Sequence, residues 1–463
     1  MDIFEKALEY FNREDIRAQA EEDLAKIVAV PSVAEETGGE KPYGKEPARA
    51  LDTVKELAEK YGFEFQNHDY RCASVFYGKG AKDVGIVTHV DVVPASEGWQ
   101  SDPYKMVVAD DKFIGRGTND DKGPFIQSLY TLRFLKENNI ELPFRVRLIV
   151  GSGEEIGCAD LDHFKSTCRV PDFSFTPDSE YPVCIGEKGI LTVNVVLGKL
   201  QENIKELSGG TVPNAVPFEA HAIVETDREL KNTEFVKVEK TGKLQKITAS
   251  GLAAHASTPE KGRNAIGVLA DYMLANGLLD DGDSKKSFEF IKDSCTEYLG
   301  KTLGIDGRND AFGYLTCIGG VLKVVNGKIV QNFNIRYLPE FSASQMAEKI
   351  ENKLKGTGFT LEVLDSSEGY SVSADDEKIK ALTEACESVL KIPCKPYTMG
   401  GGTYARSLPH TVAFGAAIIS ERSHFGPSRG GPHQCDEYMT KREFYDGMNI
   451  FVRALVNLSK VIR

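Results

Sequence analysis

The sequence predicts an α/β fold in which a mostly parallel central sheet is flanked by helices and a second, α+β domain is inserted. Three observations indicate this class. Apolar segments of strand type alternate with amphipathic helical segments between residues 64 and 177, a rhythm typical of parallel sheets. Several of the strand segments end in acidic residues or histidine. Near residue 186 the pattern becomes β-rich, and the first pattern returns near residue 376.

Length and composition narrow the class further. A chain of 463 residues exceeds the size at which single cores stop growing, so about two or three domains are expected. The net charge of -13 argues against a nucleic-acid partner and suits small or cationic ligands. The 9 scattered cysteines form no C-x-x-C pair, which favours a reducing cytoplasm over a disulfide framework. The charged N-terminus predicts no signal peptide, and no run reaches the roughly 18 apolar residues of a membrane helix, so no membrane partner is expected.

The first part of the chain is expected to form a scaffold of helices and strands. Periodicity predicts one or two helices at 3–29, another at 46–60, and a third after Pro124 with Phe125, Leu129, Leu132 and Leu135 on one stripe. Strand-type segments are predicted at 64–69, 74–78, 85–88, 144–150 and 173–177.

The later part contains the predicted insertion. Its β-type segments lie at 190–197, 218–224, 245–250 and 328–337, and its helices near 264–276 and 343–355. Helical signals of the first domain resume at 376–390, and a capping box at Thr440 to Glu443 predicts the start of a C-terminal helix. We therefore expect a discontinuous domain of residues 1–185 and 376–463 and an inserted domain of residues 186–375.

Side chains that can bind metal stand at the strand ends and in glycine-rich turns. Carboxyl ends of strands are the usual place for active sites in open α/β sheets. Taken singly, each such residue would more often be structural, but together they supply two imidazoles and three carboxylates. These N and O donors suit zinc, manganese or cobalt, and with one shared carboxylate they suffice for two ions. The candidate ligands are His89, Asp120, Glu155, Asp178 and His433.

Two glycine patterns imitate other sites. Gly151-x-Gly153 follows a strand as a dinucleotide loop would, but Glu154 and Glu155 would direct negative charge at the pyrophosphate. The segment from Gly426 to Gly430 matches the G-x-S-x-G nucleophile motif, but its proline and the lack of a preceding strand fit a nucleophile elbow poorly. Neither a nucleotide cofactor nor a serine nucleophile is predicted.

The motifs together resemble the M20 family of dinuclear metallopeptidases, in that family's order and over essentially the whole chain. The segments that carry the resemblance are His89-Val-Asp91, Gly115 to Pro124, Glu154-Glu155, Pro177 to Pro182 and Pro432-His433-Gln-x-Asp-Glu. The resemblance implies a zinc-peptidase-like catalytic domain. Within the family, Ser208 to Pro217, Ala254 to Ala265, Asn334 to Tyr337 and Met399 to Arg406 are similar to the PepV-type bacterial dipeptidases, so the insertion is expected to be a lid.

Carried over residue by residue, the resemblance implies a site for two divalent ions. Asp120 would bridge both ions, His89 and Asp178 would hold one, and Glu155 and His433 the other. Zinc is favoured, with manganese or cobalt as alternatives. The resemblance also implies a cis peptide between Asp120 and Asp121.

Two further carboxylates beside these ligands are implied to serve catalysis. Asp91 would hold the His89 ring through its remote N–H, and Glu154 would be the general base for the water between the ions. The alternative interpretations are a strand-end cap for Asp91 and a charge at the start of a helix for Glu154.

In the lid, His255 is implied to polarise the scissile carbonyl. Its alternative is a histidine of the lid core. The residues expected to contact substrate are Arg336, Asn214, Gly401, Gly402 and Thr403, and the alternative for Arg336 is a solvated position on a strand.

The resemblance therefore implies a cytoplasmic, monomeric dipeptidase that acts on small peptides with a free N-terminus, with the long lid replacing a partner subunit. The first alternative is an M20 deacylase acting on N-acyl amino acids or diamino acids. The second is a non-catalytic metal- or peptide-binding protein on the same fold, which would have no need for Glu154 and His255.

Overall fold

The computed structural model describes residues 2–421, 424–426 and 429–463 and divides the chain into two compact units. Unit 1 comprises Met1–Ile185, Val372–Tyr397 and Gly402–Arg463, and unit 2 comprises Gly186–Ser371 and Thr398–Gly401. The boundaries drawn from the sequence differ from this division at residues 372–375 and 398–401. Residues 427 and 428 of the G-x-S-x-G segment lie outside the described residues.

Unit 1 is built on a mixed sheet with the strand order β1-β2-β6-β3-β7-β22-β9. These strands are β1 (Glu64–His68), β2 (Cys72–Tyr77), β3 (Asp83–His89), β6 (Arg145–Gly151), β7 (Phe173–Thr176), β9 (Val183–Glu187) and β22 (Thr411–Phe414). The pairs β6–β3, β3–β7 and β7–β22 are parallel, which confirms the predicted α/β class for the centre of the sheet. The outer pairs are antiparallel, in β1–β2 because only a short turn joins the two strands.

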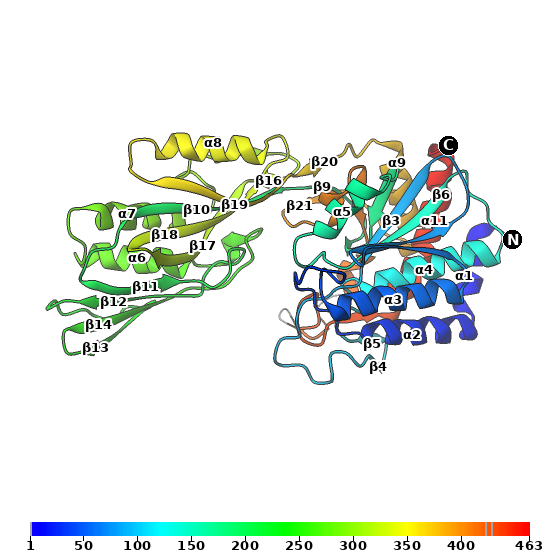
Figure 1. The fold of residues 1–463 in the computed structure, drawn as a ribbon, viewed down its shortest axis with the longest axis horizontal. Coiled ribbons are helices and arrows are strands. Elements are labelled where there is room, and N and C mark those ends of the chain that lie inside the picture. Colours follow the sequence, from blue (N-terminus) through cyan, green and yellow to red (C-terminus); the bar gives the residue numbers. More distant parts are fainter. Residues whose placement is uncertain (1, 422–423, 427–428) are drawn as a thin grey trace. The chain divides into compact units, whose positions relative to one another are not determined.

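Helices cover this sheet (Figure 1). They are α1 (Ile3–Asn12), α2 (Glu14–Val28), α3 (Lys45–Lys60), α4 (Lys122–Glu137), α5 (Ala159–Thr167), α9 (Glu377–Leu390), α10 (Tyr404–Ser407) and α11 (Lys441–Val461). The sequence predicted that one apolar stripe of α4 is buried, but all residues from Lys122 to Leu135 are buried. The reason is that α2, α11 and the strands β3 and β6 contact this helix from several sides. The predicted capping box of α11 is confirmed by reciprocal hydrogen bonds between Thr440 and Glu443.

Unit 2 contains an antiparallel sheet with the strand order β13-β14-β12-β11-β17-β18-β10-β19. Its strands are β10 (Gly189–Lys199), β11 (Ile204–Gly209), β12 (Glu219–Glu225), β13 (Val236–Thr241), β14 (Leu244–Ser250), β17 (Thr316–Val325), β18 (Lys328–Tyr337) and β19 (Thr360–Ser367). The helices α6 (Ala265–Ala275), α7 (Asp283–Thr296) and α8 (Ala343–Leu354) share one hydrophobic core with it, and α6 and α7 lie side by side (Figure 1).

The two faces of this sheet differ in chemistry. Alternate residues of β18, such as Phe333 and Ile335, point into the hydrophobic core under the helices. The residues between them, Asn332, Asn334 and Arg336, are polar and nevertheless buried. Unit 2 therefore presents a polar face, and this face carries Arg336.

Short elements complete the two units. Unit 1 also contains β4 (Val107–Ala109), β5 (Lys112–Ile114) and β24 (Tyr438–Thr440), which form a small sheet, and the parallel pair β8 (Ser179–Glu180) and β23 (Ala416–Ala417). Unit 2 also contains the hairpin of β15 (Arg308–Asn309) and β16 (Gly313–Tyr314) and, separately, the short strand β20 (Tyr370–Ser371). The strand β21 (Tyr397–Met399) begins in unit 1 and ends in unit 2. No helix among the described residues combines the length and apolar character that a membrane span requires.

Candidate metal centre

The predicted ligands of unit 1 meet at one edge of its sheet. His89 is the last residue of β3, while Glu154 and Glu155 follow β6 and Asp178 follows β7. These three strands are adjacent and parallel, so their carboxyl ends lie together. Two loops from elsewhere in unit 1 bring Asp120 and His433 to the same place.

The side chains form two groups that could each hold an ion. One group is His89, Glu154 and Asp178, the other is Asp120, Glu155 and His433, and in each group the potential ligand atoms lie within 4.8 Å of one another. This grouping places Glu154 as a potential ligand beside His89 and Asp178.

Asp120 belongs to the second group and also faces His89 of the first. Its Oδ1 atom is 3.1 Å from Nε2 of His89, and its Oδ2 atom is 3.1 Å from Nε2 of His433. His433 Nε2 is also 3.1 Å from Glu155 Oε1, and His89 Nε2 is 3.8 Å from Asp178 Oδ2. A carboxylate whose two oxygens face two different imidazoles has the geometry that a bridging ligand requires.

The ring of His89 is oriented for metal binding. It is completely buried, and its Nδ1 atom lies 3.0 Å from the main-chain oxygen of Asp91, to which an Nδ1–H would donate. Within the described residues, its Nε2 atom has no hydrogen-bond partner of normal geometry. Such a buried orphan nitrogen, directed at two carboxylates, fits a divalent cation.

Asp91 contacts the His89 ring and a second candidate ligand. The carboxylate of Asp91 lies 3.3 Å from His89 Nδ1, farther than its own main-chain oxygen, and its Oδ2 atom accepts a hydrogen bond from the N–H of Glu155 at 3.0 Å. Asp91 therefore connects two candidate ligands: it contacts His89 through its main-chain oxygen and its carboxylate, and Glu155 through its carboxylate.

The electrostatics of the cluster favour added positive charge. Burial, together with the neighbouring carboxylates of Glu155 and Asp120 and against the influence of His89, raises the pKa of Glu154 to about 8. Burial likewise raises the pKa of Glu155 and holds that of Asp178 well above its ordinary value. Hydrogen bonds to Asp120 and Glu155 raise the pKa of His433 to about 11. A cluster that binds protons this tightly is one in which divalent cations would compete with protons for the same oxygens.

The turns that present the ligands are held by further buried carboxylates. Asp121 accepts a hydrogen bond from the N–H of His89 at 3.0 Å, and the Asp120–Asp121 peptide is cis, as predicted. Asp160 accepts hydrogen bonds from the N–H groups of Ser152 and Gly153, both at 2.9 Å, and also from the hydroxyl of Tyr404. Sequence reasoning assigned no role to Asp160, since an aspartate near a helix start has no motif of its own.

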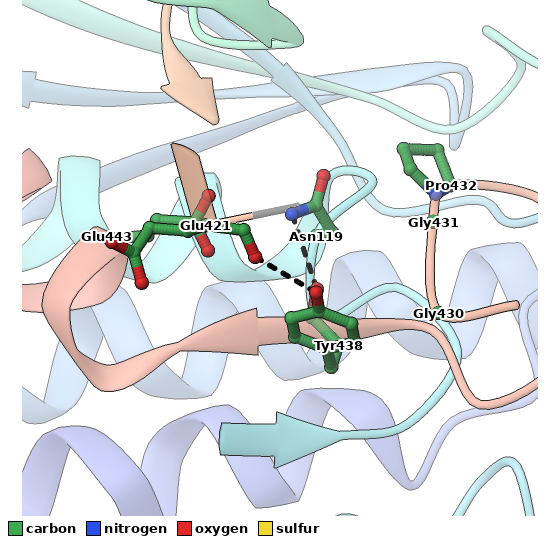
Figure 2. A pocket seen from close by; sticks show the side chains of 7 residues that line it. All are labelled: Asn119, Glu421, Gly430, Gly431, Pro432, Tyr438 and Glu443. Atoms are coloured by element: carbon green, nitrogen blue, oxygen red, sulfur yellow. Dashed lines mark hydrogen bonds between the residues drawn. The ribbon is translucent and has the colours of Figure 1, made fainter. Parts of the chain in front are cut away.

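A small cavity lies beside the Asp120 and His433 loops (Figure 2). Its volume is about 20 Å³, enough for about one water molecule. Asn119 donates a hydrogen bond from its side chain to the main-chain oxygen of Tyr438 at 3.3 Å, and Gly431 and Pro432, which precede His433 in the sequence, form part of the wall (Figure 2). The cavity therefore lies next to the candidate ligands, too small to admit a substrate.

Unit 2 brings two of its predicted site residues together. Ala215 and His255 form an isolated antiparallel bridge, and the N–H of Ala256 donates to the main-chain oxygen of Asn214 at 3.0 Å. The side chain of His255 is exposed, so the alternative of a lid-core histidine is wrong. Its Nδ1 atom accepts from the N–H of Ser257 at 3.2 Å, which places the proton of the neutral ring on Nε2.

Arg336 belongs to the same part of unit 2. Its guanidinium donates to the side chain of Asn334 at 2.9 Å and to the main-chain oxygen of Gly400 at 3.3 Å. Arg336 is 5 % exposed, so the alternative of a solvated strand position is wrong. Gly401 lies with it in unit 2, whereas Gly402 and Thr403 belong to unit 1. Thr403 caps α10 by accepting a hydrogen bond from the N–H of Ala405.

Paired imidazole and carboxylate groups at the carboxyl edge of an α/β sheet are typical of hydrolases with two metal ions. The chain matches peptidase family M20/M25/M40 over residues 85–457, and it belongs to this family. The family prediction is thus confirmed.

Similar proteins agree with this assignment. The "Putative dipeptidase SSP1012" of Staphylococcus saprophyticus is 32% identical over 465 residues, which cover 94% of this chain and 96% of that protein. The "Putative dipeptidase SH1171" of Staphylococcus haemolyticus is 31% identical, with coverage of 96% and 98%.

Solved structures share the fold. Human carnosine dipeptidase 1 matches with a TM-score of 0.59 at 14% identity, covering 99% of both chains. The di-peptidase Dug1p of Saccharomyces cerevisiae matches with a TM-score of 0.60 at 14% identity, covering 100% of this chain and 98% of its own.

Proposed function

We propose that this chain is a dipeptidase that hydrolyses small peptides with the help of two divalent metal ions. The observation that carries the metal-dependent part is the position of Asp120, whose two oxygens each lie 3.1 Å from a different histidine Nε2 atom. The names of the two staphylococcal relatives support the preference for dipeptides. This chain matches each of these relatives over nearly its whole length.

In this proposal the ions are held by the five ligands predicted from the sequence. Asp120 would be the shared ligand, His89 and Asp178 would hold one ion, and Glu155 and His433 would hold the other, with zinc preferred over manganese and cobalt. When bound, the ions would supply Lewis-acid activation of water and of the scissile carbonyl.

Glu154 moves the proton. Its carboxylate takes a proton from the attacking water and then donates it to the nitrogen of the leaving amine. Its pKa of about 8 in the ion-free cluster falls when positive charge enters the site, because a nearby cation favours the ionised carboxylate. A carboxylate whose pKa is lowered by a nearby cation, and which is already buried beside the ligands, fits this task.

The residues of unit 2 and of the 401–403 turn bind the rest of the substrate. His255 carries its proton on Nε2 and can donate it in a hydrogen bond to the oxygen that becomes negative. Arg336, Asn214, Gly401, Gly402 and Thr403 are proposed to hold the α-carboxylate of the substrate. In a dipeptide that carboxylate lies one residue beyond the scissile carbonyl, so a fixed cation at this distance selects for length. Unit 1 thus corresponds to the catalytic domain and unit 2 to the lid.

A substrate panel tests the proposal. Metal-free protein supplied with Zn²⁺ or Mn²⁺ is assayed with a dipeptide, its C-terminal amide, the matching tripeptide and an N-acetyl amino acid. The dipeptide is expected to be cleaved fastest. Preferential cleavage of the N-acetyl amino acid would instead identify a deacylase, and no cleavage of any of the four would favour a binding protein. The monomeric state and the cytoplasmic location stay predictions.

A further inference from the structure

A buried carboxylate outside the proposed ligand set binds the loop that carries Asp120. This residue, Glu437, is 0% exposed. Its Oε1 atom accepts hydrogen bonds from the backbone N–H groups of Gly117, Asn119 and Asp120, each at 3.0 Å. Because three N–H groups of one loop converge on a single oxygen, the loop closes around the carboxylate as a backbone nest closes around an anion.

The other oxygen of Glu437 anchors the carboxylate from the opposite side. Oε2 accepts a hydrogen bond from Arg116 Nη1 at 2.6 Å, and the guanidinium of Arg116 lies over the ring of Trp99 at 5.3 Å. The main chain contributes as well, because the N–H of Gly115 donates to the main-chain oxygen of Glu437 at 2.9 Å. A buried ion pair is weak evidence of stabilisation, since apolar residues of the same volume often serve as well. The ion pair between Arg116 and Glu437 matters here because it fixes the position of the Glu437 carboxylate.

The position of Glu437 links two candidate ligands. His433 precedes it in the same segment, and the carboxylate of Glu437 binds the N–H of Asp120 directly. Asp120 faces the imidazoles of His89 and His433, while its neighbouring carboxylates repel it. Three hydrogen bonds and an ion pair through Glu437 fix the backbone of the loop that carries Asp120.

We propose that Glu437 is a positioning residue for Asp120, which it holds in its ligand geometry before any ion arrives. The inference rests on the two-ion site proposed above. Glu437 is not one of the proposed ligands, and its two oxygens are bound by Arg116 and by the N–H groups of the loop. Its loss is therefore expected to weaken metal binding in protein that is still folded, an effect that a purely structural residue would not have.

The test is a Zn²⁺ titration of metal-free wild type and Glu437→Gln against a chelating dye, with bound metal counted at saturation. The amide places its NH₂ group against either Arg116 or the three N–H donors, so one half of the arrangement is lost. Removing a residue that hydrogen-bonds to a metal ligand typically lowers metal affinity by about 10- to 100-fold. We expect a decrease of this size in the affinity for the more weakly bound of the two Zn²⁺ ions. Thermal unfolding of the metal-free proteins is measured in parallel.

Asp23→Asn is the matched control. Asp23 is also a buried carboxylate of unit 1, paired with Lys60 Nζ at 2.7 Å and bound by the hydroxyls of Tyr61 and Tyr130. This variant is expected to lower the unfolding temperature and to retain wild-type Zn²⁺ affinity.

The outcomes are distinct. Wild-type Zn²⁺ affinity in Glu437→Gln, or equal weakening in Glu437→Gln and Asp23→Asn, overturns the positioning role alone. Fewer than two ions in wild type overturns the proposed metal site and the inference with it. If Glu437→Gln does not fold, Glu437→Asp decides, because its shorter side chain keeps the charge but cannot reach both Arg116 and the loop, and wild-type affinity in that variant overturns the role.

Discussion

Replacing Glu154 by glutamine separates a general base from a metal ligand. The substitution preserves the shape of the side chain and removes its ability to take a proton from water. General base catalysis typically contributes 10²–10⁴-fold, so kcat is expected to fall by about that factor, equivalent to about 2.7–5.5 kcal/mol of transition-state stabilisation. The number of bound ions is expected to stay at the wild-type value, because the proposed ligand set does not include Glu154.

The structure makes this measurement decisive, because the potential ligand atoms of Glu154, His89 and Asp178 lie within 4.8 Å of one another. Dipeptide turnover and metal content are measured on the same preparation, the latter by elemental analysis. Glu155→Gln is the matched control, as a neighbouring carboxylate that is a proposed ligand, and it is expected to lose metal as well as activity. Near-wild-type turnover in Glu154→Gln refutes the base assignment, and loss of an ion in that variant makes Glu154 a ligand.

Two further predictions concern substrate length and stability. Arg336→Met is expected to lower kcat/KM for a dipeptide by about 10- to 200-fold, since a charge-assisted hydrogen bond is worth roughly 1.5–3 kcal/mol, and to leave the slower cleavage of the C-terminal amide unchanged. If the ratio of kcat/KM for the dipeptide to kcat/KM for its amide is the same in Arg336→Met as in wild type, Arg336 does not bind the substrate carboxylate. Burial and the nearby Arg147 lower the pKa of His68 from 6.5 to about 4, so the unfolded chain binds a proton in this range that the folded protein does not. As the pH falls from 7.5 to 4, the free energy of unfolding of wild type should therefore fall by at most about 3 kcal/mol relative to that of His68→Gln. Both free energies are measured by urea unfolding of metal-free protein. A pH-independent difference would contradict this.

The elements that could be predicted from the sequence are those with a local signal. Apolar runs predicted β3, β6 and β7, and the candidate ligands His89, Glu155 and Asp178 stand at or just past the ends of these strands. The capping box placed the start of α11 because Thr440 and Glu443 are only three positions apart. The periodicity of α4 did not predict that the helix is buried on all sides, because such burial depends on neighbours that come from distant parts of the chain.

The supporting residues of the site could not be predicted in the same way. Glu437 stands in a recognised motif, yet its partners Arg116 and Gly117 are far away in sequence, and only the fold brings them within hydrogen-bond distance. Asp160 is a similar case, because its role depends on the turn at Ser152 and Gly153 folding back onto it. The return of residues 398–401 to unit 2 also has no local signal, because a run of three glycines is compatible with many turns.

The most direct test of the two-ion dipeptidase is to follow bound metal and dipeptide hydrolysis in one titration of metal-free protein with Zn²⁺. The proposal predicts that hydrolysis appears as the site fills and reaches its maximum at two ions per chain. Full activity at one ion per chain, or two bound ions without hydrolysis of any dipeptide, would contradict it.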